Sequence, residues 1–250
     1  MYKSIVEEAK KEFLLNQEKV NNQKRAKRKS KPALWPSDLL NCKRKAAHHL
    51  IGSEPTLSFS YSSLNYMDGG NVLEDSTARA LKHVYNAKQN VTLRNGVWSG
   101  KADFIIDFKG KNPVIIEHKA TGENKFKDKK QLPKREHVAQ LALYGHLYKQ
   151  LYGVSPELVL YYMGWGCFAE FGLDIKVKKI TVTGVIDNTF VTKNLRINIK
   201  QEIEDLEQMY KEVMNGRPLP DRLTNKSAGC TFMGKPSCSY YYNCWGNNGR

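Results

Sequence analysis

The segment that most constrains the fold is VIIEHKA, residues 114–120. Its first half, Val114 to Ile116, is typical of a buried strand. Because side chains alternate across a strand, Glu117 and Lys119 project from one face and His118 from the other. An acid and a lysine beside a buried strand are costly unless they pair with each other or serve a ligand. The segment therefore predicts either an ion pair at the edge of a sheet or a functional site.

Strand and helix patterns alternate around this segment. Residues 90–108 predict two strands that turn at Asn95-Gly96, a dipeptide favoured in tight hairpins. A helical pattern over 134–153 ends at Gly153. Further strand patterns cover 157–164, 168–175 and 178–186, and helical patterns cover about 67–86 and 191–214. This order predicts an α/β or α+β domain whose sheet is covered by helices.

The two ends of the chain differ from this middle. We expect residues 1–36 to form an amphipathic helix and a basic linker, because apolar residues recur at helical spacing before the lysine- and arginine-rich run 24–31. That run is either a solvated linker or a phosphate-binding or localisation patch. Ser37 is the expected N-cap of the next helix. Residues 37–250 are expected to form a single domain with a cysteine-rich tail.

The charge balance favours a polyanionic partner. The chain has 40 Lys and Arg against 25 Asp and Glu, a formal net charge of +15. Such an excess favours nucleic acid, because each neutralised phosphate releases counterions, although basic residues can also merely keep a surface solvated. The 13 Tyr and 4 Trp could stack on bases. The sequence contains no apolar run long enough for a signal peptide or a membrane span, so we expect an intracellular, cytoplasmic protein without a membrane partner.

A second carboxylate is expected beside Glu117. Asp103 lies on the strand before that of Glu117, and adjacent antiparallel strands can bring both carboxylates to one cation. Hard oxygen donors of this kind suit Mg²⁺ or Mn²⁺. Asp107, on the same face of the strand, is the competing candidate. We prefer Asp103 because it leaves residues 104–106 as core.

Asp103 and the triplet Glu117-His118-Lys119 resemble the PD-(D/E)XK nuclease superfamily. The resemblance implies a restriction-endonuclease-like α/β core with a mixed central β-sheet flanked by helices and a helical annex. It also implies catalytic roles for Asp103, Glu117 and Lys119: the two acids hold the metal, joined by the backbone carbonyl of His118, and the lysine positions or activates the attacking water. A metal at such a site generates hydroxide near neutral pH and offsets charge that develops on the phosphate.

Two further motifs resemble the RecB-like branch of that superfamily. Gln140 and Tyr144 match the Q-x-x-x-Y motif of the helix after the catalytic lysine, which implies that they contact DNA. Residues 70–75, GNVLED, are similar to a G-x-x-x-H motif with Glu74 in place of the histidine. The resemblance therefore implies that Glu74 is a third metal ligand, with Asp75 as the alternative.

Four cysteines resemble those of the iron–sulfur branch of RecB-like nucleases, which includes the AddB nuclease domain and CRISPR-associated adaptation exonucleases. The resemblance implies that Cys42, Cys230, Cys238 and Cys244 hold a [4Fe-4S] cluster that closes the tail onto the N-terminal helix. The late cysteines are spaced C-x7-C-x5-C, whereas the branch has C-x2-C-x5-C. Zn²⁺ is the first alternative to iron–sulfur, and free thiols are the second. Cys167 is expected to be a core thiol.

Taken together, these resemblances imply a Mg²⁺- or Mn²⁺-dependent deoxyribonuclease, and more specifically an exonuclease acting on single-stranded DNA or DNA ends. Its setting would be recombination, repair, replication or CRISPR adaptation in a bacterium, archaeon or phage. Its partners would be DNA and a helicase, an annealing protein or an integrase. The alternative is a non-catalytic DNA-binding or recruitment subunit that keeps the nuclease fold.

Overall fold

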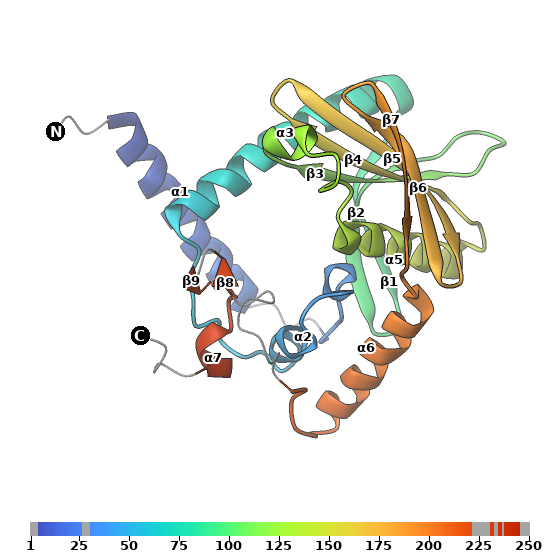
Figure 1. Ribbon diagram of the computed structural model, residues 1–250. Helices are drawn as coiled ribbons and strands as arrows, with labels where there is room; N and C mark the ends of the chain where they lie inside the picture. The colour runs from blue at the N-terminus through green and yellow to red at the C-terminus, as the bar shows by residue number, and fades with distance from the viewer. Residues whose placement is uncertain (1–4, 27–30, 222–230, 233–234, 237, 246–250) are drawn as a thin grey trace.

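The computed structural model describes residues 5–26, 31–221, 231–232, 235–236 and 238–245. Within this part of the chain, seven strands form one sheet whose spatial order follows the sequence from β1 to β7 (Figure 1). β3 and β4 are parallel, and the other neighbouring strands are antiparallel, so the sheet is mixed. The strands are β1 (Lys88–Asn95), β2 (Trp98–Ile106), β3 (Val114–Ala120), β4 (Glu157–Gly164), β5 (Cys167–Lys176), β6 (Lys179–Ile186) and β7 (Thr189–Leu195).

Helices cover the sheet and extend from it. The described helical elements are α1 (Ile5–Ala26), the 3₁₀ turn η1 (Pro36–Asp38), α2 (Lys43–Leu50), α3 (Tyr61–Tyr85), α4 (Asn124–Lys127), α5 (Arg135–Tyr152), α6 (Ile199–Met214) and α7 (Tyr241–Trp245). In the tail, β8 (Thr231–Phe232) pairs with β9 (Lys235–Pro236). The chain is therefore an α/β protein with a mixed sheet flanked by helices, as the sequence predicted at that level.

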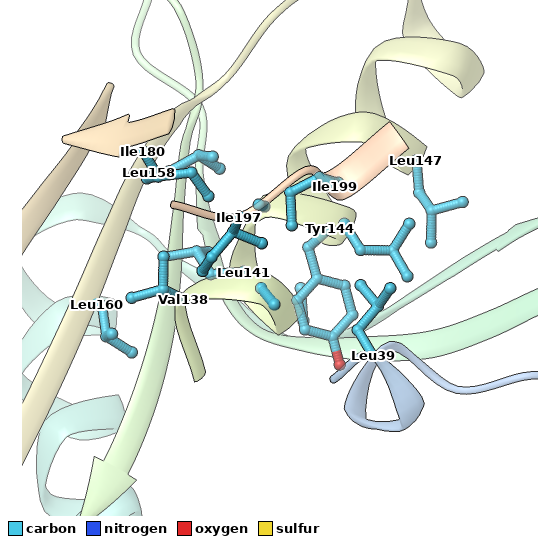
Figure 2. Packing of buried hydrophobic residues seen from close by; sticks show 14 of the residues in the cluster. Leu39, Val138, Leu141, Tyr144, Leu147, Leu158, Leu160, Ile180, Ile197 and Ile199 are labelled. Atoms are coloured by element: carbon cyan, nitrogen blue, oxygen red, sulfur yellow. The ribbon is translucent and has the colours of Figure 1, made fainter. Parts of the chain in front are cut away.

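Helix α5 packs on one face of the sheet and connects the parallel strands β3 and β4. Parallel neighbours need such a crossover, because a tight turn cannot join them. The buried residues of α5 include Val138, Leu141 and Leu147, and they meet Leu158 and Leu160 of β4 in one apolar cluster. Figure 2 shows these side chains together with the Tyr144 ring. This crossover fixes α5 above β3, the strand that carries Glu117.

Helix α3 packs against the opposite face. Ala78 of this helix belongs to a second apolar cluster with Phe104 and Ile106 of β2 and Ile116 of β3. Helix α1 packs on α3 and lies away from the sheet, as Figure 1 shows. Strands β2 and β3 are thus buried from both sides, which explains their continuous apolar runs.

Several local predictions are confirmed. The hairpin predicted between β1 and β2 is present, but its turn residues are Gly96, with a φ of 55°, and Val97, because Asn95 is still paired with Trp98. Helix α5 ends at Gly153, whose φ of 73° is a left-handed conformation that costs glycine little.

The β5–β6 turn at Val177-Lys178 lies at the end of the sheet where β3 begins.

Three predicted helix boundaries were wrong. Ser37 does not cap a helix: it lies inside η1, where the Asp38 carboxylate accepts the Trp35 backbone N–H at 2.8 Å, and α2 begins only at Lys43. The helix expected over 67–86 begins at Tyr61, because the Ser60 side chain accepts the Ser63 backbone N–H at 3.2 Å and caps it.

The third error concerns the predicted helix over 191–214. Residues 189–195 are instead strand β7, paired along its length with β6. Its alternating exposure and its β-branched residues Thr189, Val191 and Thr192 suit an edge strand. The helix starts at Ile199, after Asn198 caps it through the Gln201 backbone N–H at 3.3 Å.

Candidate active site

The register of β2 and β3 brings Asp103 and Glu117 opposite each other. Phe104 pairs with Ile116 and Ile105 with Ile115, so the next residues along the two antiparallel strands are Asp103 and Glu117. Backbone pairing between the strands stops at Phe104. Instead, the Asp103 carboxylate accepts the backbone N–H of His118 at 2.8 Å. This side-chain bond satisfies a backbone donor that the sheet no longer pairs, and it fixes the Asp103 carboxyl beside β3.

The β1 residue opposite Asp103 is Asn90, and it has an unusual backbone. Pairing of β1 with β2 is present at Gln89 and Val91 but omits Asn90, whose φ is 56°. This left-handed conformation is one that asparagine tolerates better than most residues. The irregularity therefore disturbs the ladder at the position of Asp103, as local distortions beside functional sites often do.

Glu117 is a buried carboxylate with one oxygen that meets no donor. It is 1% exposed, and Lys119 Nζ donates a short hydrogen bond to its Oε1. Its Oε2 is buried and meets no donor in the described structure, although the Glu117 and Asp103 carboxyls lie close enough for a protonated Glu117 to donate to Asp103 and lower the pKa of Asp103. A buried oxygen without a donor is costly, and a site that can accept a cation is one explanation for it.

Burial and mutual repulsion change the ionisation of this group of side chains. Desolvation, reinforced by the Asp103 charge, raises the pKa of Glu117 to about 8 in spite of nearby Lys119. Desolvation likewise raises the pKa of Asp103 to about 6, opposed by Lys119 and the His118 backbone bond. Burial by itself would lower the pKa of Lys119, but the carboxylates of Glu117, Asp103 and Glu74 outweigh it and raise that pKa. The site thus holds acidic groups that would ionise fully only with added positive charge.

Glu74 lies near this group, but the alternatives to the predicted ligands do not. Glu74 on α3 adds to the electrostatic repulsion felt by Asp103 and Glu117, and its Oε1 accepts a hydrogen bond from Gln89 Nε2 at 3.4 Å. Asp75 is exposed, and it lines a hollow of about 410 Å³ along α3. Asp107 pairs with Lys88 at 2.7 Å outside the site.

The carboxylates are not arranged as a set of three ligands. Over the described residues, no group of three or more His, Cys, Asp or Glu side chains is placed to hold a metal ion. Asp103 and Glu117 therefore offer two carboxylates, and Glu74 would have to move to complete a set of three.

Gln140 and Tyr144 share one face of α5, one turn apart, with the Gln140 amide 3.5 Å from the Tyr144 hydroxyl. Tyr144 is 3% exposed, and its hydroxyl donates to the Lys101 backbone carbonyl at 2.7 Å. Tyr144 thereby ties α5 to the start of β2, two residues before Asp103. Gln140 is only partly buried, so of the two it has the side chain that a substrate can reach.

His118 faces away from the carboxylates, as alternation predicted. Its ring is 5% exposed and packs edge-on to Phe104, with centroids 6.5 Å apart, and also against Tyr161. Its Nε2 is buried without a hydrogen-bond partner in the described structure. Desolvation lowers the pKa of His118 to about 4, so the ring is neutral near pH 7.

The connection from β3 to α5 is a lysine-rich segment next to the candidate site that the sequence patterns did not single out. Residues 121–134 carry five lysines, and they begin two residues after Lys119. Lys193 of β7 holds this connection: its ammonium donates to the backbone carbonyls of Lys129 at 2.6 Å and Lys130 at 3.0 Å, and to that of Leu132. The only sequence signal for such an element was its lysine content.

The described part of the cysteine-rich tail packs against α2 and the loop after it. The Thr56 backbone N–H donates to the Ser239 carbonyl at 2.7 Å, and the His48 ring stacks on Tyr240 with centroids 5.1 Å apart. Cys244 Sγ lies 3.9 Å from His48 Nε2. Cys42 immediately precedes α2.

The four predicted cluster ligands are described unequally. Cys42, Cys238 and Cys244 lie among the described residues and are partly buried, whereas Cys230 falls outside them. Cys167, expected to be a core thiol, packs against the main apolar cluster at the start of β5.

Comparison with known proteins adds little to this picture. No family model matches the sequence, and no curated protein matches it. The crystal structure of a protein named SSO0001 is similar with a TM-score of 0.48 and 18% sequence identity, over 84% of this chain and 87% of that one. A similarity this low carries no conclusion about fold or function. No helix in the described ranges is long and apolar enough to cross a membrane.

Proposed function

We propose that this protein is a metal-dependent deoxyribonuclease. One observation carries the proposal: two acidic side chains from neighbouring strands, Asp103 and Glu117, meet beside the ammonium of Lys119, and Glu117 has a buried oxygen that meets no donor. An ion pair that served only stability would not need a second buried acid next to it. The same residues carry the resemblance to the PD-(D/E)XK superfamily.

The residues present fit a divalent cation. Asp103 and Glu117 would hold it, because their hard oxygens suit Mg²⁺ or Mn²⁺, ions that keep several waters and need few protein carboxylates. Glu74 and the His118 backbone carbonyl are proposed as further ligands. When bound, such an ion supplies an activated water and offsets negative charge on a phosphate.

Lys119 is proposed to orient the attacking water and to donate to the phosphate. Its raised pKa keeps it charged at neutral pH, and about a quarter of its side chain is exposed on the site. A charged donor placed where negative charge develops is among the strongest contributions a protein can make to such a reaction. Gln140 is proposed to contact the DNA strand, with Tyr144 setting its position.

DNA is the proposed substrate. The net charge of +15 favours a polyanionic partner, and the lysine-rich connection 121–134 begins two residues after Lys119, so its lysines could help to draw the DNA backbone to the site. Cleavage of single strands or of DNA ends is the finer proposal. A helicase, an annealing protein or an integrase is the proposed kind of partner.

We further propose that Cys42, Cys230, Cys238 and Cys244 hold a [4Fe-4S] cluster, with Zn²⁺ as the alternative. The packing of the tail on α2 supports it, because the cluster would join the same two segments. Metal analysis and the visible absorption of anaerobically purified protein distinguish an iron–sulfur cluster from bound Zn²⁺. Cys238→Ser should lower the metal content and the thermal stability more than it lowers the turnover of the remaining folded protein.

The test of nuclease activity uses end-labelled single- and double-stranded DNA with Mg²⁺ or Mn²⁺. Lys119→Ala should remove cleavage and leave DNA binding largely intact. Lys178→Ala is the matched control, because this exposed lysine lies in the β5–β6 turn at the other end of the sheet. Failure of the wild-type protein to cut either substrate with either metal refutes the proposal. DNA binding without cleavage would instead favour a non-catalytic DNA-binding subunit.

A further inference from the structure

His137 is a polar side chain next to the candidate site to which no role has yet been given. It lies in the first turn of α5, three residues before Gln140 and seven before Tyr144, so all three share one face of the helix. The charge of Lys119 acts on His137, just as the charges of Glu117 and Asp103 act on Tyr144. This face of α5 therefore borders the site along two turns.

A hydrogen-bond chain fixes which nitrogen of His137 carries the proton. The Lys134 backbone N–H donates to Tyr162 Oη at 3.1 Å, and Tyr162 Oη lies 2.8 Å from His137 Nδ1. Tyr162 is fully buried, so its hydroxyl hydrogen needs an acceptor, and Nδ1 is the acceptor within reach. Nδ1 is then unprotonated, and the ring hydrogen resides on Nε2.

The ring stays neutral in this arrangement. Desolvation, together with the positive charges of Lys119 and Lys134, lowers the pKa of His137 to about 3. A protonated ring would also carry a hydrogen on Nδ1, and this hydrogen would face the hydroxyl hydrogen of Tyr162. His137 is thus a hydrogen-bond donor of fixed orientation, and it is not a general acid at neutral pH.

The donor on Nε2 is available to a ligand. Nε2 makes no hydrogen bond in the described structure, and it belongs to a side chain that is only partly buried. His118 differs in this respect, because its Nε2 is fully enclosed on the other face of the sheet. A neutral N–H next to Lys119 suits an anionic oxygen, which it can bind without carrying a proton away.

We infer that His137 is a substrate-binding residue that donates from Nε2 to a non-bridging oxygen of a DNA phosphate, with Tyr162 as the positioning residue that sets its tautomer. The inference rests on the proposed nuclease function and extends it. The role involves no proton transfer and no covalent step. It gives the site a third donor, besides Lys119 and Gln140, on the side where α5 begins.

Side-chain replacements separate the two nitrogens of the ring. Glutamine can place its amide nitrogen near the position of Nε2, whereas asparagine places it near Nδ1 and alanine has neither. Loss of one hydrogen bond to a charged group corresponds to about a tenfold to hundredfold loss in kcat/KM. We expect that loss for His137→Ala and His137→Asn, and we expect His137→Gln to keep most of the activity. His146→Ala is the matched control, an exposed histidine on the same helix.

Three measurements decide the outcome: kcat and KM on single-stranded DNA with Mn²⁺, DNA binding in the Lys119→Ala background, and the thermal midpoint of each variant. Weaker DNA binding by Lys119→Ala/His137→Ala, with rescue by glutamine, supports the inference. Equal loss in all three His137 variants, in step with a lowered thermal midpoint, overturns it in favour of a purely structural role. Wild-type kinetics in His137→Ala also overturn it and leave the nuclease proposal standing. Absence of cleavage by the wild-type protein refutes both.

Discussion

Glu117 should make the metal-free protein less stable as the pH rises. Its side chain is 1% exposed, and burial raises its pKa from 4.5 to about 8. At pH values below 4.5 the carboxyl is protonated in both the folded and the unfolded chain. Between these two pKa values the unfolded chain has released a proton that the folded protein retains, so rising pH favours unfolding. Each retained proton lowers the free energy of unfolding by about 1.4 kcal/mol per pH unit.

The window from 4.5 to about 8 sets a ceiling of about 5 kcal/mol for this loss. The assay is urea denaturation of chelator-treated protein at intervals across that window. Glu117→Gln should flatten the dependence, and Glu204→Gln, an exposed acid on α6, should leave it unchanged. If the carboxylates hold Mg²⁺ as proposed, saturating Mg²⁺ should stabilise the wild-type protein increasingly toward high pH, because the ion would bind their ionised forms. Equal slopes for wild type and Glu117→Gln would show that Glu117 is not the buried, proton-retaining group described here.

Three further substitutions test the supports of the site. Gly100→Ala should lower the free energy of unfolding by about 1–3 kcal/mol in denaturant titrations, because its Cβ would lie 2.6 Å from the Pro36 ring and 2.9 Å from Tyr144; an unchanged midpoint would contradict this packing. Tyr144→Phe should cost about 1–2 kcal/mol in the same assay by removing the donor to the Lys101 carbonyl, and a neutral effect would count against that bond. Lys193→Met should speed tryptic cleavage within residues 121–134, because three carbonyls lose their shared donor; an unchanged cleavage rate would mean that the connection is held by other contacts.

The sequence predicted best those elements whose signals are local. The Asn95-Gly96 pair predicted a hairpin and Gly153 predicted a helix end, because glycine adopts at little cost the left-handed backbone that such positions use. Strand β7 was mistaken for helix because its pattern is weak by itself. Its conformation depends on pairing with β6, a contact that the sequence of residues 189–195 does not encode alone.

Parts of the candidate site could likewise be predicted from local sequence signals, and other parts could not. Strand alternation was enough to place Glu117 and Lys119 together, and the hairpin order placed Asp103 near them. Alternation gives no account of Asn90, Lys193 or His137, because their roles depend on backbone geometry and on partners distant in sequence. The sequence also could not predict that the Tyr144 hydroxyl is buried, because Q-x-x-x-Y spacing defines a helix face and not what covers that face.

The order of the strands places the proposed site residues apart from much of the sheet. Asp103, Glu117, Lys119 and the α5 side chains all come from residues 100–144, whereas β5–β7 continue the sheet beyond β4. The tight turn after Lys176 is solvent-facing, with Val177 77% exposed, and it lies at the end of the sheet where β3 begins, away from the carboxyl end of β3. A fluorophore or an immobilisation tag attached there would leave the proposed nuclease site untouched, so the proposed binding of a DNA end could be followed on single molecules.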